Sequence, residues 1–120
     1  MTGVQTCALP ILGRGTDNGV TLGAYVSVKE RDKISDLVDE AIKNGAAVRT
    51  GGKKPEGVGA FYPATVMTID KYNSILKKEI FGPVAPIVIF DLEDEGIELC
   101  NDTEFGLISY VFSKIGRAHV

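Results

Sequence analysis

The sequence predicts an α/β fold with about four strands and two main helices. Three features support this prediction: an amphipathic helical pattern over residues 27–44, short runs of β-forming residues separated by glycines and polar turns, and a continuous apolar run over residues 84–90. Strand, helix and strand patterns follow one another over residues 84–113. Because such connections are right-handed in nearly all proteins, we expect one right-handed βαβ unit there.

The first helix is predicted from Ser27 to Asn44. Ser27 and Glu30 have the S-x-x-E spacing of a capping box, and Gly45 follows the last turn as a stop signal. Charged residues cover one side of the helix, so the run over residues 29–33 is interpreted as a solvated helix face rather than a binding patch. The apolar side recurs at helical spacing, at Ile34, Leu37, Val38, Ala41 and Ile42.

The remaining elements are predicted from composition and turn signals. Strands are expected over residues 46–50, 62–69, 84–90 and 108–113, and a short second helix, capped by Asp91, over residues 92–101. The run over residues 84–90 lacks polar alternation and suits a strand that is buried on both faces. The residues expected in the core are Ile34, Leu37, Val38, Val48, Val66, Val84, Ile87, Val88, Ile89, Leu99, Val111 and Phe112.

The composition is that of an ordinary globular domain and excludes several functions. The length of 120 residues suits one small domain, and a net charge of -3 gives no electrostatic case for binding nucleic acid or an anionic membrane. No apolar run approaches the length of a membrane span, so we expect a cytoplasmic protein. Cys7, Cys100 and His119 make neither a disulfide framework nor a metal site. Cys100 has no neighbouring His or Lys in the sequence to activate it, so we expect a small buried core thiol.

The two ends of the chain differ in character from the rest. Residues 1–11 resemble the translation of a short-read sequencing adapter, and residues 115–120 resemble the opposite strand of the same kind of adapter. We therefore expect both ends to be non-native and residues 12–114 to be the natural sequence. A genuine tail at each end is the alternative.

The chain is organised around residues 77–84, with the sequence K-K-E-I-F-G-P-V. Gly82 and Pro83 disfavour a regular helix or a central strand, so we predict a fixed irregular loop. Glu79 and Phe81 are two residues apart, which on an extended backbone places both side chains on the same side. A carboxylate beside an aromatic ring suits a ribose and a flat heteroaromatic group, because the acid accepts hydrogen bonds and the ring gives apolar contact. The alternative is a surface Glu and a core Phe that flank a turn.

Four segments, in order, resemble the aldehyde dehydrogenase superfamily. Residues 77–84 resemble its E-E-I-F-G-P-V signature, and Gly51-Gly52 with residues 61–66 resemble its GG…G-x-F-x-P-T-V segment. Residues 97–107 resemble A-I-x-x-A-N-x-T-x-Y-G-L, and residues 110–113 resemble A-x-V-F-T. The chain is most similar to succinate-semialdehyde-type or broad-specificity bacterial enzymes, and its fold is expected to be part of their catalytic domain.

The resemblance implies an NAD(P)-dependent enzyme that oxidises an aldehyde to a carboxylic acid through a cysteine thiohemiacetal and thioester. The family's nucleophilic Cys, general base and dinucleotide-binding fold map onto no residue of this chain. We therefore assign no catalytic residue and no metal ligand here, and we expect the isolated chain to be inactive. The family's enzymes are several times longer and usually form homodimers or homotetramers.

The resemblance also implies cofactor contacts at three positions. In the family, the acid before I-F-G-P hydrogen-bonds the nicotinamide ribose, which implies this role for Glu79. Phe81 is implied to pack near the nicotinamide, and Leu107 to lie close to the same pocket. Lys78 stands where the family often has a second Glu, so the chemistry of that position is altered. The choice between NAD and NADP stays open, as does the aldehyde.

Two other interpretations stay open beside the enzyme fragment. One is a stand-alone small α/β module that uses Glu79 and Phe81 to bind a nucleotide-like ligand. The other is a non-catalytic interaction protein. An upstream Cys loop and a Rossmann-like region in the same reading frame would distinguish the enzyme from both.

Overall fold

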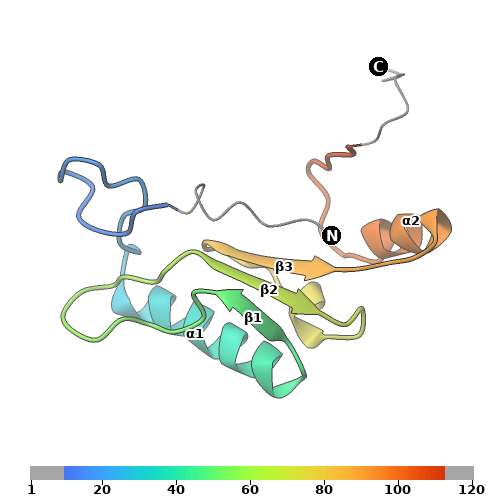
Figure 1. Cartoon of the computed structure of the whole chain (residues 1–120), viewed down its shortest axis with the longest axis horizontal. Coiled ribbons are helices and arrows are strands. Elements are labelled where there is room, and N and C mark those ends of the chain that lie inside the picture. Colours follow the sequence, from blue (N-terminus) through green and yellow to red (C-terminus); the bar gives the residue numbers. More distant parts are fainter. Residues whose placement is uncertain (1–9, 113–120) are drawn as a thin grey trace.

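A computed structural model describes residues 10–112 of the chain, which form two helices, one short 3-10 helix and a three-stranded sheet. The sheet order is β1-β2-β3, with β1 antiparallel to β2 and β2 parallel to β3. Helix α1 lies along one face of the sheet, and α2 lies beyond the carboxyl end of β3 (Figure 1). The α/β prediction is confirmed. The elements are α1 (Val28–Lys43), β1 (Ala47–Thr50), β2 (Thr65–Ile69), η2 (Ser74–Lys77), β3 (Val84–Val88) and α2 (Glu93–Asn101).

Helix α1 forms where its local signals predict it. The hydroxyl of Ser27 caps the helix by accepting the N–H of Glu30 at 3.2 Å, while the Glu30 carboxylate pairs with Lys33 instead of reaching back to the cap. At the other end Gly45 takes a φ of +93°, a conformation that glycine adopts without strain. The predicted bounds therefore agree with the observed helix to within one residue at each end.

The core lies between α1, the buried face of β2 and η2. Of the predicted core residues, Ile34 and Val38 are buried, while Leu37, Val84 and Val88 are partly buried against the core cluster. Strand β2 alternates between buried and half-buried positions, as expected for a strand with one face on a helix. The buried apolar side chains are Ile34, Val38, Ala41, Ala46, Tyr62, Met67, Ile69 and Ile75.

Five predicted core residues are exposed instead. Strand β3 alternates between half-buried and exposed residues, so the prediction of burial on both faces is wrong. The reason is that β3 is an edge strand and no second layer covers its outer face within residues 10–112. The exposed residues are Val48, Ile87, Ile89, Val111 and Phe112.

The fourth strand and the predicted βαβ unit are also wrong. Residues 108–112 form no strand, because they pair with no other strand of the described chain, and residue 113 lies outside the described residues. The parallel connection is instead β2-η2-β3. Helix α2 begins at Glu93 with Leu92 at the N-cap position and no capping side chain, so Asp91 is not the cap.

The proposed non-native ends fall mostly outside the described residues. Residues 1–9 and 113–120 lie outside the described residues, and so does most of what the adapter interpretation concerns. Within the described part, the carbonyl of Ile11 accepts the N–H groups of Thr21 and Leu22, each at 3.0 Å. No helix among the described residues is long and apolar enough to cross a membrane.

Candidate functional site

The signature loop, residues 77–84, connects η2 to β3 and is fastened at both ends. Lys78 is extended, with φ −113° and ψ 142°, and its N–H donates to the carbonyl of Ile75 at 3.1 Å. At the other end the carbonyl of Pro83 accepts the N–H of Thr65, at the start of β2, at 2.7 Å. Val84 donates its N–H to the carbonyl of Gly82 at 2.8 Å, which closes a tight turn around Pro83. The backbone thus forms the fixed irregular loop that Gly82 and Pro83 predict.

The side chains of the signature loop alternate between core and solvent. Ile80 packs against the core cluster, whereas Glu79 and Phe81 on either side of it are exposed. This alternation is what an extended backbone produces, and it places the carboxylate and the ring on the same side. Phe81 is 75% exposed, so it is not a core residue of the described chain.

The Glu79 carboxylate is available to a ligand. It makes no hydrogen bond and no ion pair with any residue in the range 10–112. The nearby Lys77 is occupied elsewhere, since its ammonium group pairs with the Asp102 carboxylate and donates to the Asp102 carbonyl at 2.9 Å. A free carboxylate accepts hydrogen bonds from hydroxyl groups, and an exposed ring offers apolar contact. Glu79 and Phe81 therefore fit a ribose that carries a flat ring.

Beneath the loop, Gly82 lies directly against Tyr25. A Cβ added at Gly82 would overlap the Tyr25 hydroxyl, and it would lie 3.0 Å from Tyr25 Cζ and 3.3 Å from Ile34 Cγ1. Only glycine therefore allows the loop to pack this closely. The sequence carries no signal for this contact, because Tyr25 precedes Gly82 by more than fifty positions and lies in a loop outside the quoted motifs.

The Gly51-Gly52 motif, which follows β1, is linked to the same loop through Thr65 of β2. Both glycines have positive φ, +70° and +82°, and a Cβ at Gly51 would lie 2.6 Å from Thr65 Oγ1. The Thr65 hydroxyl accepts the N–H of Gly52 at 2.9 Å and donates to the carbonyl of Pro63 at 3.0 Å. Because the N–H of Thr65 also holds Pro83, the glycine motif is linked to the signature loop through a single residue.

Leu107 is not brought to the signature loop. It is fully exposed on the segment that follows α2. It lines a shallow hollow with Cys100 and Phe105, and this hollow includes neither Glu79 nor Phe81. The structure therefore brings together two of the three predicted contact residues.

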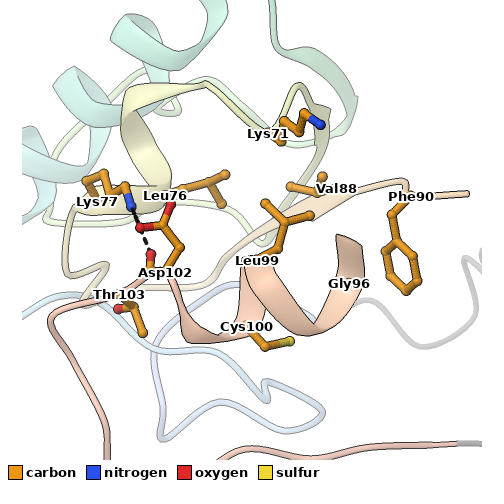
Figure 2. Close-up of a pocket in the computed structure, with 10 residues that line it drawn as sticks. All are labelled: Lys71, Leu76, Lys77, Val88, Phe90, Gly96, Leu99, Cys100, Asp102 and Thr103. Carbon is orange, nitrogen blue, oxygen red and sulfur yellow. Dashed lines mark hydrogen bonds and ion pairs between the residues drawn. The ribbon is translucent and has the colours of Figure 1, made fainter. Parts of the chain in front are cut away.

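A separate hollow of about 250 Å³ lies where α2 meets η2 and β3. Figure 2 shows Leu76, Val88 and Leu99 converging on it from these three elements. The charges of the two lysines that line it are already neutralised by ion pairs, because Lys77 pairs with Asp102 and Lys71 pairs with Glu95 at 2.6 Å. An apolar hollow without a free polar group is a gap in packing rather than a specific binding site.

Cys100 lines this hollow but is exposed, so the prediction of a buried core thiol is wrong. The physical reason is that α2 buries only Gly96 and packs few side chains against the rest of the described chain. Among residues 10–112, no group of three or more His, Cys, Asp or Glu side chains could hold a metal ion.

Comparison with known proteins identifies the family. A family model described as the aldehyde dehydrogenase family matches residues 4–119. A succinate-semialdehyde dehydrogenase of Paenarthrobacter nicotinovorans is 42% identical over 103 residues, which make up 85% of this chain and 23% of that protein.

Solved structures of proteins with similar names also resemble this chain in fold and sequence. An aldehyde dehydrogenase of Mycobacterium tuberculosis complexed with NAD+ has a TM-score of 0.76 and 36% identity over 84% of this chain and 21% of its own. A succinic semialdehyde dehydrogenase of Streptococcus pyogenes in complex with NADP+ has a TM-score of 0.75 and 32% identity over 82% of this chain and 22% of its own. The chain spans less than a quarter of each of these three proteins. On the extent of the family match and the identity to these relatives, the chain belongs to the aldehyde dehydrogenase family.

Proposed function

We propose that this chain is the part of an NAD(P)-dependent aldehyde dehydrogenase that positions the nicotinamide ribose. The observation that carries the proposal is that Glu79 and Phe81 are both exposed, with the half-buried Ile80 between them, on a loop fastened to both η2 and β2. Family membership and the NAD+ and NADP+ complexes of similar proteins support it. The choice between NAD and NADP depends on contacts outside the chain.

The two side chains have different tasks in this proposal. The bound cofactor supplies the chemistry of hydride acceptance. Glu79 accepts hydrogen bonds from the ribose hydroxyls, and its negative charge makes these bonds stronger than neutral ones. Phe81 offers an apolar surface beside the nicotinamide. Because the loop is fixed before a ligand arrives, little conformational freedom is lost when these contacts form.

The catalytic groups belong to a longer protein in this proposal. Its Cys would attack the aldehyde carbon to give a thiohemiacetal, and loss of hydride from that carbon to the cofactor, with loss of the hydroxyl proton, would give a thioester. A general base would then help water to hydrolyse the thioester. Neither group is assigned to a residue of this chain. The 42% identity to a succinate-semialdehyde dehydrogenase supports a succinate-semialdehyde-type or broad-specificity enzyme. We place it in the cytoplasm as a homodimer or homotetramer.

We also propose that residues 12–114 are the native part of the chain, with non-native ends at residues 1–11 and 115–120, although the family model extends into both ends, over residues 4–119. Reading the source DNA with an independent library checks this. The proposal requires the reading frame to continue on both sides of residues 12–114 with a sequence different from the present ends. Recovery of the same end sequences would contradict it.

Aldehyde-dependent formation of NADH or NADPH tests the proposed function. We expect the longer protein to oxidise succinate semialdehyde, or a range of aldehydes, and the 120-residue chain to show no activity because it lacks a nucleophile and a base. Activity of the purified 120-residue chain that Cys100→Ala abolishes would overturn the assignment. Tight binding of NAD by this chain alone would favour the stand-alone module instead.

A further inference from the structure

The middle of the signature loop rests on Tyr25. The backbone hydrogen bonds that fasten the loop involve Lys78 at one end and Pro83 at the other. Within residues 10–112 they leave residues 79–82 without a backbone hydrogen bond to a residue outside the loop. Three side chains lie beneath this middle part. One is Ile80, which belongs to the loop itself, and the other two are Tyr25, whose hydroxyl meets Gly82, and Ile34, whose Cγ1 would lie 3.3 Å from a Cβ at Gly82.

Tyr25 is itself held in place. It lies just before α1, and its N–H donates to the carbonyl of Ala60 at 2.8 Å. Its ring packs against the core cluster, and its hydroxyl is buried without a hydrogen-bond partner among the described residues. Burial also raises the pKa of Tyr25, so the hydroxyl stays neutral at physiological pH.

The buried hydroxyl of Tyr25 makes no hydrogen bond within the described chain. An unpartnered buried hydroxyl is unfavourable, and phenylalanine would avoid the cost. The contact it does make is steric, against a glycine that admits no side chain at that point. A rigid aromatic side chain with two rotatable bonds is well suited to hold a backbone segment at a fixed distance from the core.

We propose that Tyr25 is a positioning residue for the cofactor contact. By holding Gly82 at a fixed distance from the core, it keeps Glu79 and Phe81 where the nicotinamide ribose requires them. This inference rests on the proposed function for its kinetic consequence. Its structural part, that Tyr25 sets the position of residues 79–82, stands independently. Loss of the ring would let the loop move toward the core, and a displacement of about 1 Å can slow a reaction about a hundredfold.

Two measurements on the full-length dehydrogenase test the proposal. Hydrogen exchange of the Thr65 and Lys78 amides, whose hydrogen bonds fasten the loop at its two ends, reports the loop alone when it is followed by mass spectrometry without cofactor. Single-turnover formation of NADH reports hydride transfer, and NAD titration reports binding. We expect Tyr25→Leu to increase loop exchange and to slow hydride transfer roughly ten- to a hundredfold, with a smaller change in NAD affinity. Tyr25→Phe keeps the ring but loses the hydroxyl that meets Gly82, so its rate should lie between those of Tyr25→Leu and the wild type.

Tyr72→Leu is the matched control, because Tyr72 is 84% exposed and lies in the turn before η2. It should change neither loop exchange nor rate. Should Tyr25→Leu fail to fold, Gly82→Ala tests the same contact from the other side. Adding Tyr25→Phe to Gly82→Ala removes the oxygen that the new Cβ meets and should recover about threefold or more of the lost rate.

The outcomes separate the inference from the proposed function. Unchanged exchange of the Thr65 and Lys78 amides in Tyr25→Leu, or no recovery in the double variant, would overturn the role of Tyr25. Increased loop exchange in Tyr25→Leu supports that role even if Glu79→Gln transfers hydride at the wild-type rate. That last result would overturn the proposed function of Glu79 and leave the structural support by Tyr25 in place.

Discussion

Thr65 joins the two motifs of the chain through one buried hydroxyl and one N–H. The hydroxyl satisfies Gly52 and Pro63, while the N–H holds Pro83 at the end of the signature loop. Thr65 is almost completely buried, so no solvent can replace these partners after a substitution. Thr65 is therefore expected to contribute to the stability of both motifs.

Thr65→Val tests this linkage, because valine has nearly the same shape but leaves the Gly52 N–H without its acceptor. We expect the free energy of unfolding to fall by about 1–3 kcal/mol. Urea denaturation of the 120-residue chain measures it. Thr68→Val is the control on the same strand, since the Thr68 hydroxyl accepts only an exposed Arg49 side chain at 3.2 Å. The control should change stability by less than about 0.5 kcal/mol, and equal losses in both variants would contradict the account.

At the residue scale, the sequence predicts the contact pair but not its support. Glu79 and Phe81 follow from a local motif and from the alternation of an extended backbone. Tyr25 could not be predicted, because its contact with Gly82 depends on how a distant loop packs against α1. The role of Leu107 remains a prediction. Leu107 is not brought to Glu79 in the described chain, because residues 105–112 form no strand that pairs with the sheet.

Helix α2 is attached differently from α1. Whereas α1 buries an apolar side against the sheet, α2 buries only Gly96 and is held by two exposed ion pairs, Lys71 with Glu95 and Lys77 with Asp102. Exposed ion pairs contribute little to stability and are screened by salt. We therefore expect α2 to open locally more often than α1.

The attachment of α2 should depend on pH. The hydrogen bond from Lys71 lowers the pKa of Glu95, and the same bond raises the pKa of Lys71. A lowered carboxyl pKa stabilises the fold above the ordinary value of 4.5 and loses this effect as the pH falls through the folded value. A raised lysine pKa stabilises below the ordinary value of 10.5 and loses its effect above that pH.

Protection of the α2 amides should thus be constant near neutral pH and fall on acidification below the ordinary carboxyl pKa. Hydrogen exchange of α2 relative to α1 as a function of pH, corrected for the intrinsic exchange rate, measures this. Glu95→Gln should weaken the acid dependence and leave the part that belongs to the Lys77–Asp102 pair, whereas Glu98→Gln on the same helix should retain it in full. An acid dependence that is unchanged in Glu95→Gln would contradict the role of the Lys71–Glu95 pair.

Helices and strands are predicted correctly where the interactions that form them are local in the sequence, and wrongly where they join distant segments. Helix α1 is predicted well because its cap at Ser27, its apolar spacing and its stop at Gly45 are all local. The strand expected over residues 108–113 fails because a strand needs a partner, and composition does not identify one. Burial of β3 on both faces fails for the same reason, since no second layer is present in the described part of the chain.

Many large apolar side chains are exposed among residues 10–112. The exposed large apolar side chains concentrate after residue 80, on the signature loop, β3, α2 and residues 105–112. Patches of this kind mark surfaces that another part of a protein covers. Together with a match to less than a quarter of the relatives' length, this distribution supports the longer enzyme proposed above.

The central claim is that Glu79 orients the nicotinamide ribose in that enzyme. Glu79→Gln keeps the size of the side chain and some hydrogen bonding but loses the negative charge, which makes the stronger bond. Because many other contacts hold a dinucleotide, the substitution should slow hydride transfer more than it weakens binding. Lys78→Gln is the matched control, since Lys78 is the exposed neighbour on the same loop.

Pre-steady-state formation of NADH or NADPH by the full-length protein tests this claim most directly. The account predicts that Glu79→Gln lowers the burst rate by about tenfold or more, while Lys78→Gln retains it and the catalytic thiol still reacts with an alkylating reagent in both variants. A wild-type burst rate in Glu79→Gln, with only the yield of folded protein reduced, would contradict it and return Glu79 to the role of a structural residue in a turn.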